Sequence, residues 1–442
     1  MSCKLRIIHI NDVYILENLP SLTTLIREKS EGPDCTIAVL AGDFVAPSLL
    51  SALDLGFGMV DMLLRAGIRY VCFGNHETDI PMDSLFKRIE EFQAGGGVWL
   101  NTNMPDFPFP LPEHHILEIA SQGQERKIGL IGLLCNYKTI FAQGAFSGAA
   151  PSKESVNDAA VRFHKKLHDE EDVDLVLPLT HQDVEDDRVL SGMTIEDGKT
   201  PLFPVVLGGH DHEVFIEELD NGSWVIKAGS DAHKTAIIDV TWESQDSTVP
   251  QVTVDLVDTK NWAADPEVKA VAERHEAVLS ALDSAIIYRH PKDAPLLSSK
   301  NVKIGESTIA KLLCTAVRES LSFSTPTDPV DCTLLQAGMI RGKKDYPEGH
   351  FTLASLRLEF PAAKEVTVVP MPGRVIAAAL KDTRAGEGEV GSSRYLQTCD
   401  NIVVAPRGES VVSIGGLPFE SDKMYTVAIP VSYTHLTLPT IA

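Results

Sequence analysis

Five short polar clusters contain residue types that bind metal ions, and each cluster comes just after a short apolar run. They are Asp12-Val13-Tyr14, Gly42-Asp43, Gly74-Asn75-His76-Glu77, Thr180-His181 and Gly208-Gly209-His210-Asp211-His212. Any one of them is explained more simply as a turn or a helix cap, because Asp, Asn and Gly are common there. Five in one region point instead to a shared site, since the carboxyl ends of strands in an open α/β sheet gather site residues.

Six side chains in these clusters form a coherent set of metal ligands. Carboxylate and amide oxygens with imidazole nitrogens, and without thiolates, suit Mn, Zn, Fe or Co rather than a structural zinc or a calcium site. Six donors are too many for one catalytic ion with open positions. They fit two ions about 3.5–4 Å apart that share a bridging carboxylate. The six are Asp12, Asp43, Asn75, His181, His210 and His212.

The apolar runs before the clusters predict a layered α/β domain. Short runs that are apolar on both faces are typical of strands covered by helices. The predicted strands span Leu5–Ile10, Thr36–Leu40, Tyr70–Phe73, Ile128–Leu134, Leu175–Leu179 and Pro204–Leu207. The predicted helices between them span Pro20–Lys29, Pro47–Leu53, Met59–Leu64 and Ser155–His168. Two later strands are expected to form an antiparallel pair, namely Trp224–Lys227 and Thr235–Thr241.

A change of pattern after residue 262 predicts a hinge and a second domain. Asp265-Pro266 is typical of a helix N-terminus, and the helix is expected to run to about Ile286. The Pro- and Ser-rich segment Pro291–Ser299 indicates the end of a linker. A smaller α+β domain should follow. The predicted division is therefore 1–262, then a linker helix and hinge at 263–300, then 301–442.

Composition excludes several classes of function. Among 442 residues, 62 are acidic and 39 basic, and the net charge of −23 repels nucleic acid polymers and anionic membranes. A small phosphorylated substrate remains compatible with this charge if bound metal ions overcome the repulsion locally. The seven scattered cysteines predict reduced, mostly buried thiols. Without an apolar run of about 18 residues or a signal-peptide pattern, the expected location is the cytoplasm, and the oligomeric state is not indicated.

The polar clusters together resemble the motifs of the calcineurin-like metallophosphoesterases. Within that family, the chain is similar to the 5′-nucleotidase branch, whose members carry a separate C-terminal substrate domain. The resemblance covers nearly the whole chain. It implies a four-layer α/β/β/α metallophosphoesterase domain, followed by a smaller α+β substrate domain. It also implies a hydrolase that acts on nucleotides or other small organic phosphates.

The resemblance also implies a role for each candidate ligand. Asp43 would bridge two divalent metal ions. The first ion would be held by Asp12 and His212, and the second by the remaining ligands, Asn75, His181 and His210. The nucleophile would be a metal-bound water or hydroxide that attacks phosphorus in line with the departing oxygen.

Two further residues of the resemblance would act on the phosphoryl group. His76 would lie beside it as an imidazolium that stabilises the developing charge or the leaving oxygen. Asp79 matches the carboxylate that orients this histidine, and a carboxylate partner raises a histidine pKa.

The first motif departs from the family pattern, which reads Asp-x-His at the position of Tyr14. With a pKa of about 10, a tyrosine is a poor ligand for a divalent ion at neutral pH. Tyr14 could bind a trivalent iron as phenolate, as a tyrosine does in the similar purple acid phosphatases. Alternatively it only packs, and the first metal site is weaker.

The C-terminal region departs further. Arg341 matches the arginine of a substrate-binding loop, but Gln336 replaces that loop's asparagine. The base-stacking ring expected after Pro361 is replaced by Ala362, which leaves Phe360 as the nearby aromatic candidate. The tail from Val431 lacks the Gly-Gly-Asp-aromatic loop that supplies a second ring, so we expect this domain to be incomplete at its end. Stacking contributes about 1–3 kcal/mol per base, so nucleotide specificity is the property most affected.

The resulting expectation is a dinuclear-metal hydrolase of phosphomonoesters, similar to a 5′-nucleotidase. One alternative is a cyclic-nucleotide phosphodiesterase that uses the same site. Another is a degenerate, non-catalytic ligand-binding protein, in which Tyr14, Gln336, Ala362 and the tail mark the decay.

Overall fold

A computed structural model of the chain describes residues 2–121, 123–137, 140–141, 144–151, 154–324, 329–346, 350–360, 366–384, 392–405 and 410–430. The predictions that concern Ala362 and the tail from Val431 lie outside these residues. The chain forms two compact units, Met1–Leu279 and Ser280–Ala442. The predicted boundaries at 262 and 300 remain predictions, as does the hinge.

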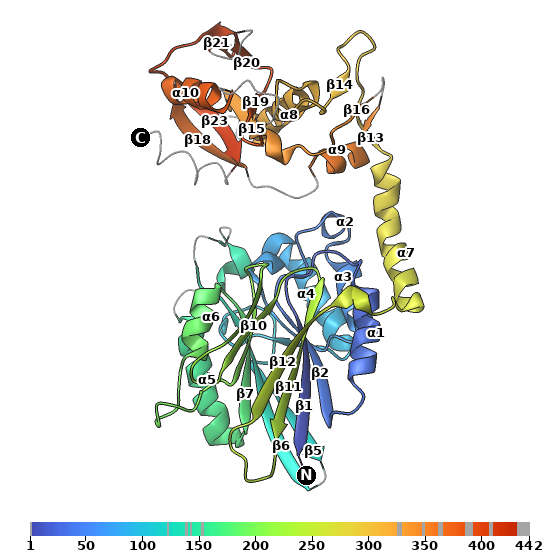
Figure 1. The fold of residues 1–442 in the computed structure, drawn as a ribbon, viewed down its shortest axis with the longest axis vertical. Coiled ribbons are helices and arrows are strands. Elements are labelled where there is room, and N and C mark those ends of the chain that lie inside the picture. The colour runs from blue at the N-terminus through green and yellow to red at the C-terminus, as the bar shows by residue number, and fades with distance from the viewer. Residues whose placement is uncertain are drawn as a thin grey trace. The chain divides into compact units, whose positions relative to one another are not determined.

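Two six-stranded mixed sheets form the centre of the first unit (Figure 1). The first has the order β12-β11-β1-β2-β3-β4, and its strands are Gln251–Asp258, Lys234–Trp242, Cys3–Ile10, Cys35–Ala41, Tyr70–Cys72 and Val98–Leu100. The second has the order β5-β6-β7-β8-β10-β9, and its strands are His114–Ser121, Gln124–Leu134, Leu175–His181, Val205–Gly209, Trp224–Ala228 and Val214–Glu218. The strands β1 to β4 run parallel in one sheet, and β6, β7, β8 and β10 run parallel in the other.

Three apolar cores hold these sheets in four layers. Alternate residues of both sheets, such as Val39 and Leu177, bury each other between the sheets. The helices α1 to α6 are Leu19–Lys29, Ser51–Asp54, Phe57–Ala66, Met82–Ala94, Val156–Glu171 and Val184–Ser191. A second core lies between the first sheet and the helices α1, α3 and α4. A third core lies between the second sheet and the helices α5 and α6. The predicted α/β/β/α arrangement is confirmed.

Two local predictions are wrong. The strands β10 and β11 do not pair with each other, because β10 pairs with β8 and β9 while β11 pairs with β1 and β12. Between them Gly229, Asp231 and Ala232 take positive φ, so the chain turns from one sheet into the other. The helix predicted from Pro47 starts only at Ser51, and its C-terminus is set by Leu55 in the left-handed region.

The second unit is α+β, as predicted, and α7 (Pro266–Asp283) contains the boundary between the units. Its largest sheet has the order β18-β23-β15-β19, with strands Val366–Pro372, Met424–Pro430, Cys332–Gln336 and Leu396–Thr398. The helices α8, α9 and α10 are Thr308–Ser324, Leu353–Glu359 and Gly373–Arg384. The short strands β13, β14, β16, β17 and β20 to β22 are Ile286–Tyr288, Leu297–Ser298, Asp345–Tyr346, Phe351–Thr352, Ile402–Val404, Val411–Ile414 and Leu417–Pro418.

Among the described residues, no helix has both the length and the apolar composition needed to span a membrane.

Candidate metal centre

The candidate ligands come from the carboxyl ends of parallel strands in both sheets. Asp12 follows β1 and Asp43 follows β2 in the first sheet, whereas His181 ends β7 and the remaining two histidines follow β8 in the second. Four of these residues take positive φ, a conformation that is uncommon outside glycine and clusters at functional sites. The four are Asp12, Asp43, His210 and His212.

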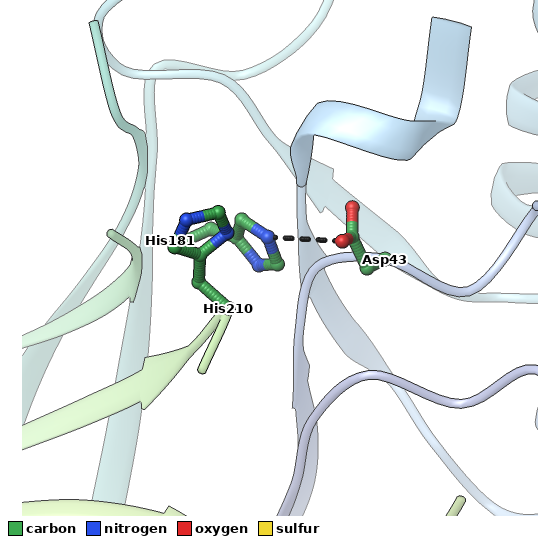
Figure 2. Close-up of side chains that lie close together, drawn as sticks. All are labelled: Asp43, His181 and His210. Atoms are coloured by element: carbon green, nitrogen blue, oxygen red, sulfur yellow. Dashed lines mark ion pairs between the residues drawn. The ribbon is translucent and has the colours of Figure 1, made fainter. Parts of the chain in front are cut away.

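Asp43, His181 and His210 form one group, in which one ligand atom of each lies within 4.8 Å of the others. Figure 2 shows the two imidazoles beside the carboxylate, with His181 Nε2 3.2 Å from Asp43 Oδ2. The amide oxygen of Asn75 joins them, because it lies 3.1 Å from both His181 Nε2 and His210 Nδ1. His181 and Asp43 are almost fully buried.

Asp12, Asp43 and His212 form a second group by the same criterion. His212 Nε2 lies 3.2 Å from Asp12 Oδ1, and Asp12 is fully buried, whereas the His212 side chain is 48% exposed. Asp43 is the residue common to both groups. The structure therefore brings all six predicted ligands to one place.

Tyr14 directs its hydroxyl into the second group. The oxygen lies 2.8 Å from His212 Nε2 and 3.3 Å from both Asp12 Oδ1 and Asp43 Oδ2. Burial and the negative charges of Asp43 and Asp12 raise the pKa of Tyr14 far above its usual range, so the hydroxyl keeps its proton. Tyr14 therefore makes polar contacts with all three side chains of this group, and its role as a metal ligand remains a prediction.

The electrostatics of the site fit bound cations. Burial alone would raise the pKa of Asp43, but the imidazoles of His181 and His76 lower it to about 2. Burial alone would lower the pKa of His181, but the Asp43 and Asp12 carboxylates raise it to about 10. Asp43 thus keeps its charge and holds a positive charge on His181, and metal ions that bind here would displace that proton.

Contacts behind the ligands fix their orientation. The Nδ1 of His181 lies 2.9 Å from the carbonyl oxygen of Ala41, which can only accept, so Nδ1 carries a hydrogen and Nε2 faces the group. A side chain at Gly42, whose φ is +74°, would place its Cβ 2.5 Å from that same Nδ1. The glycine of this motif is therefore needed for the two sheets to approach each other.

His76 and Asp79 lie together in the 3-10 helix Asn75–Asp79, beside the two groups. His76 Nδ1 is 2.6 Å from Asp79 Oδ2, and the backbone N–H of His76 donates to Asp43 Oδ1 at 2.8 Å. Burial opposes a charge on His76, but the hydrogen bond to Asp79 and the nearby carboxylates raise its pKa overall. The imidazole is 34% exposed, so it is accessible from solvent.

Several supporting residues were not predicted. Asn11, which is buried, donates to Asp12 Oδ2 at 2.7 Å, and Asp231 accepts the backbone N–H of Tyr14 at 2.8 Å. Asp183 Oδ1 lies 3.4 Å from His210 Nε2. Asn11 precedes Asp12, and Asp183 lies two residues after His181, so their closeness to a ligand in the sequence could have indicated a supporting role. Nothing in the sequence connects Asp231 with Tyr14.

Glu77, the last residue of the Gly74–Glu77 cluster, holds a backbone loop in place. Its carboxylate is fully buried and accepts the backbone N–H groups of Phe44 and Val45 at 2.8 and 3.1 Å. It also accepts those of Asp43 and Gly74. Glu77 therefore shapes the loop that presents Asp43.

Replacing Glu77 by glutamine should destabilise the first unit without removing a ligand. The glutamine NH₂ group would face backbone donors that need an acceptor, and a buried donor left without a partner costs about 1–3 kcal/mol. We expect a clear fall in melting temperature, measured by circular dichroism. Glu90→Gln, which changes an exposed residue of helix α4, is the control, and equal melting temperatures in the two variants would contradict the role.

The three substrate candidates lie in the second unit. Gln336 ends β15, and Arg341 is exposed, with its Nε donating to the carbonyl of Gly338 at 3.2 Å. Phe360 follows helix α9, and its ring is half-buried against two apolar cores. Their part in substrate binding remains a prediction.

Two family profiles match the chain, one in each unit. Residues 5–214 match the profile of the calcineurin-like phosphoesterases, and residues 287–434 match that of the 5′-nucleotidase C-terminal domain. No curated protein matches the chain.

Solved structures that resemble the chain cover nearly all of it. A 5′-nucleotidase precursor of Thermus thermophilus is 16% identical, with a TM-score of 0.59, over 98% of this chain and 90% of its own. A NAD nucleotidase of Haemophilus influenzae is 15% identical, with a TM-score of 0.63, over 97% and 89%. A 5′-nucleotidase of Candida albicans is 15% identical, with a TM-score of 0.56, over 98% and 91%. At these identities the likeness shows the fold.

Proposed function

The chain belongs to the calcineurin-like phosphoesterases that carry a 5′-nucleotidase C-terminal domain, a family of hydrolases, and from this premise we propose that it hydrolyses phosphomonoesters with two divalent metal ions. Nucleotides are the first substrates to consider, because the matched C-terminal profile and the matched structures are those of nucleotidases. The observation that carries the proposal is the position of Asp43, which belongs to both groups of candidate ligands.

The donor sets match the ions proposed. One ion would be held by Asp12, Asp43 and His212, and the other by Asp43, Asn75, His181 and His210. Both sets combine carboxylate or amide oxygen with imidazole nitrogen, which suits Mn, Zn, Fe or Co. Bound ions supply activation of water and neutralisation of the charge on phosphate.

The chain itself supplies the remaining chemistry. His76, with its raised pKa, would donate a hydrogen bond or a proton to the phosphoryl or leaving oxygen. Asp79 holds the His76 Nδ1 and so leaves Nε2 for the substrate. The exposed side of the site, formed by His212 and His76, is where a phosphate would enter.

Metal content and substrate class test the proposal together. Protein purified without chelator should bind two ions per chain and should hydrolyse para-nitrophenyl phosphate after loading with Mn, Zn, Fe or Co. Activity on AMP should exceed activity on bis(4-nitrophenyl) phosphate and on cyclic AMP. A preference for the diesters would favour the phosphodiesterase alternative, and metal binding without turnover would favour a ligand-binding protein.

We also propose that the Tyr14 hydroxyl is a ligand of the ion held by Asp12 and His212. A ferric ion would bind it as phenolate, because a bound cation lowers the pKa of its ligands. Ferric-loaded protein should then show a visible phenolate-to-iron absorption band. Tyr14→Phe should lose this band, and Tyr14→His should lose it while keeping two ions per chain. Absence of the band from the ferric-loaded unsubstituted protein would show that Tyr14 is not a ligand.

A further inference from the structure

A buried lysine lies directly behind the candidate metal centre. Lys227 is in β10, its side chain has no exposure to solvent, and its ammonium group donates to two backbone carbonyls. The distances from Nζ are 2.6 Å to the oxygen of Gln182 and 2.7 Å to the oxygen of Gly209. Neither carbonyl belongs to a metal ligand, but Gln182 follows His181 and Gly209 precedes His210.

Two carboxylates hold the lysine in place. Asp187, on α6, is fully buried and lies 3.0 Å from Nζ, and Asp211 accepts a hydrogen bond from it. Asp187 in turn accepts from the Thr180 hydroxyl at 2.7 Å and from the Gln182 amide at 2.9 Å. A buried charge is tolerated only when it is paired and hydrogen-bonded. The polar partners of the Lys227 ammonium group lie at the ends of β7 and β8 or on α6.

From this geometry we infer that Lys227 is a positioning residue that fixes the histidine-bearing ends of β7 and β8 for metal binding. The inference rests on the proposed function, because it concerns the two-metal site. The Lys227 ammonium group gives the carbonyls of Gln182 and Gly209 one common donor. Without it, the carbonyls of Gln182 and Gly209 would lose a common donor, and the backbone beside His181 and His210 would be free to separate.

The two ions should depend on Lys227 unequally. The group of Asp43, His181 and His210 takes two of its three ligands from the clamped strand ends. The group of Asp12, Asp43 and His212 takes two of its three from the first sheet, whereas the hydrogen bonds and ion pairs of Lys227 go to the ends of β7 and β8 and to α6. Loss of the lysine should therefore weaken metal binding more at the group of Asp43, His181 and His210.

Arg126 provides a matched control in the same sheet. It is likewise a buried cation, with its side chain 3% exposed, paired with Asp174 at 2.6 Å. It also donates to two backbone carbonyls, those of Ser244 and Gln245, at 2.7 and 2.9 Å. It lies near the start of β6, and Asp174 precedes β7, so this clamp is at the opposite end of the strands from the metal centre.

The test is to titrate Lys227→Met and Arg126→Met with manganese and to measure binding by isothermal titration calorimetry. The number of ions that stay bound is then counted by metal analysis after gel filtration. We expect both variants to have lower melting temperatures than the unsubstituted protein. Lys227→Met should bind one ion normally and the other about 10–100-fold more weakly, which is the usual effect of losing a residue that orients ligands. Arg126→Met should bind both ions normally. Equal binding of both ions by the two variants would overturn the inference.

Asp187→Asn distinguishes the effect of the two Lys227–carbonyl hydrogen bonds from the effect of the buried charge. This variant keeps Lys227 and its bonds to both carbonyls, so it should lose stability but keep both ions. If it lost the same ion as Lys227→Met, the effect would come from the charge balance, and the inference would be wrong. If Lys227→Met does not fold, Lys227→Gln replaces it with a neutral side chain that is one bond shorter, and the same weakening of one ion is expected.

The outcomes distinguish this inference from the proposed function. If the unsubstituted protein binds two ions but shows no hydrolysis, the proposed function is wrong. The manganese titration of the Lys227 variants still tests the role of Lys227 in that case. Two ions with hydrolysis, and unchanged metal binding in the Lys227 variants, would reject the inference alone. Fewer than two ions in the unsubstituted protein would reject both.

Discussion

Replacement of Asp43 by asparagine should reduce metal-dependent hydrolysis by at least about a thousandfold, which corresponds to about 4 kcal/mol of transition-state stabilisation. The carboxylate belongs to both groups of candidate ligands, and its loss would remove the negative charge that the two proposed ions would share. An asparagine can still accept the backbone N–H of His76 through Oδ1, so the loop geometry should survive. The measurements are metal content per chain and para-nitrophenyl phosphate turnover at saturating manganese.

Asp34→Asn is the matched control, because Asp34 lies just before β2 and Asp43 lies just after it. Asp34 accepts the backbone N–H of Lys4 at 2.8 Å and has no contact with a ligand in the described part of the chain. The control should keep two ions and full turnover. Turnover by Asp43→Asn within about tenfold of the control would contradict a bridging role.

Replacement of His76 by asparagine should lower kcat by about 10²–10⁴-fold, the usual contribution of a general acid, and should leave two ions bound. The reason is that His76 touches the site through Asp43 and Asp79 but is in neither group of ligands. Asp79→Asn should lower kcat less, because it removes the orienting partner and leaves the imidazole. The measurements are kcat under saturating substrate and metal content of the same samples.

His275→Asn is the control for this variant. His275 also pairs with a carboxylate, since its Nε2 lies 2.8 Å from Asp61, but it belongs to α7 and packs against α3. It should leave both kcat and metal content unchanged. Loss of an ion from His76→Asn would show that His76 is a ligand and that its assignment as an acid is wrong.

The local sequence was sufficient to predict which residues form the candidate centre. The apolar runs that precede Asp12, Asp43, His181 and His210 are short and apolar on both faces, which predicts covered strands. Because parallel strands place their carboxyl ends on one edge, residues after them converge without any knowledge of the loops. The same reasoning failed for β10 and β11. Two neighbouring apolar runs look alike whether they pair or separate, and positive φ at Asp231 and Ala232 cannot be read from the sequence.

Only the tertiary structure decided how the two halves of the centre meet. Asp12 and Asp43 belong to one sheet, and the histidines to the other, so their distances depend on how the sheets bury Val39, Leu177 and their neighbours between them. The same packing turns the Tyr14 hydroxyl toward His212 and buries Lys227 behind His181 and His210. Sequence periodicity specifies which face of a strand is apolar. The relative placement of two sheets, by contrast, depends on contacts among many side chains that are distant along the chain. For that reason the ligand types could be predicted from the sequence, whereas the hydrogen bonds of Lys227 behind the histidines could not.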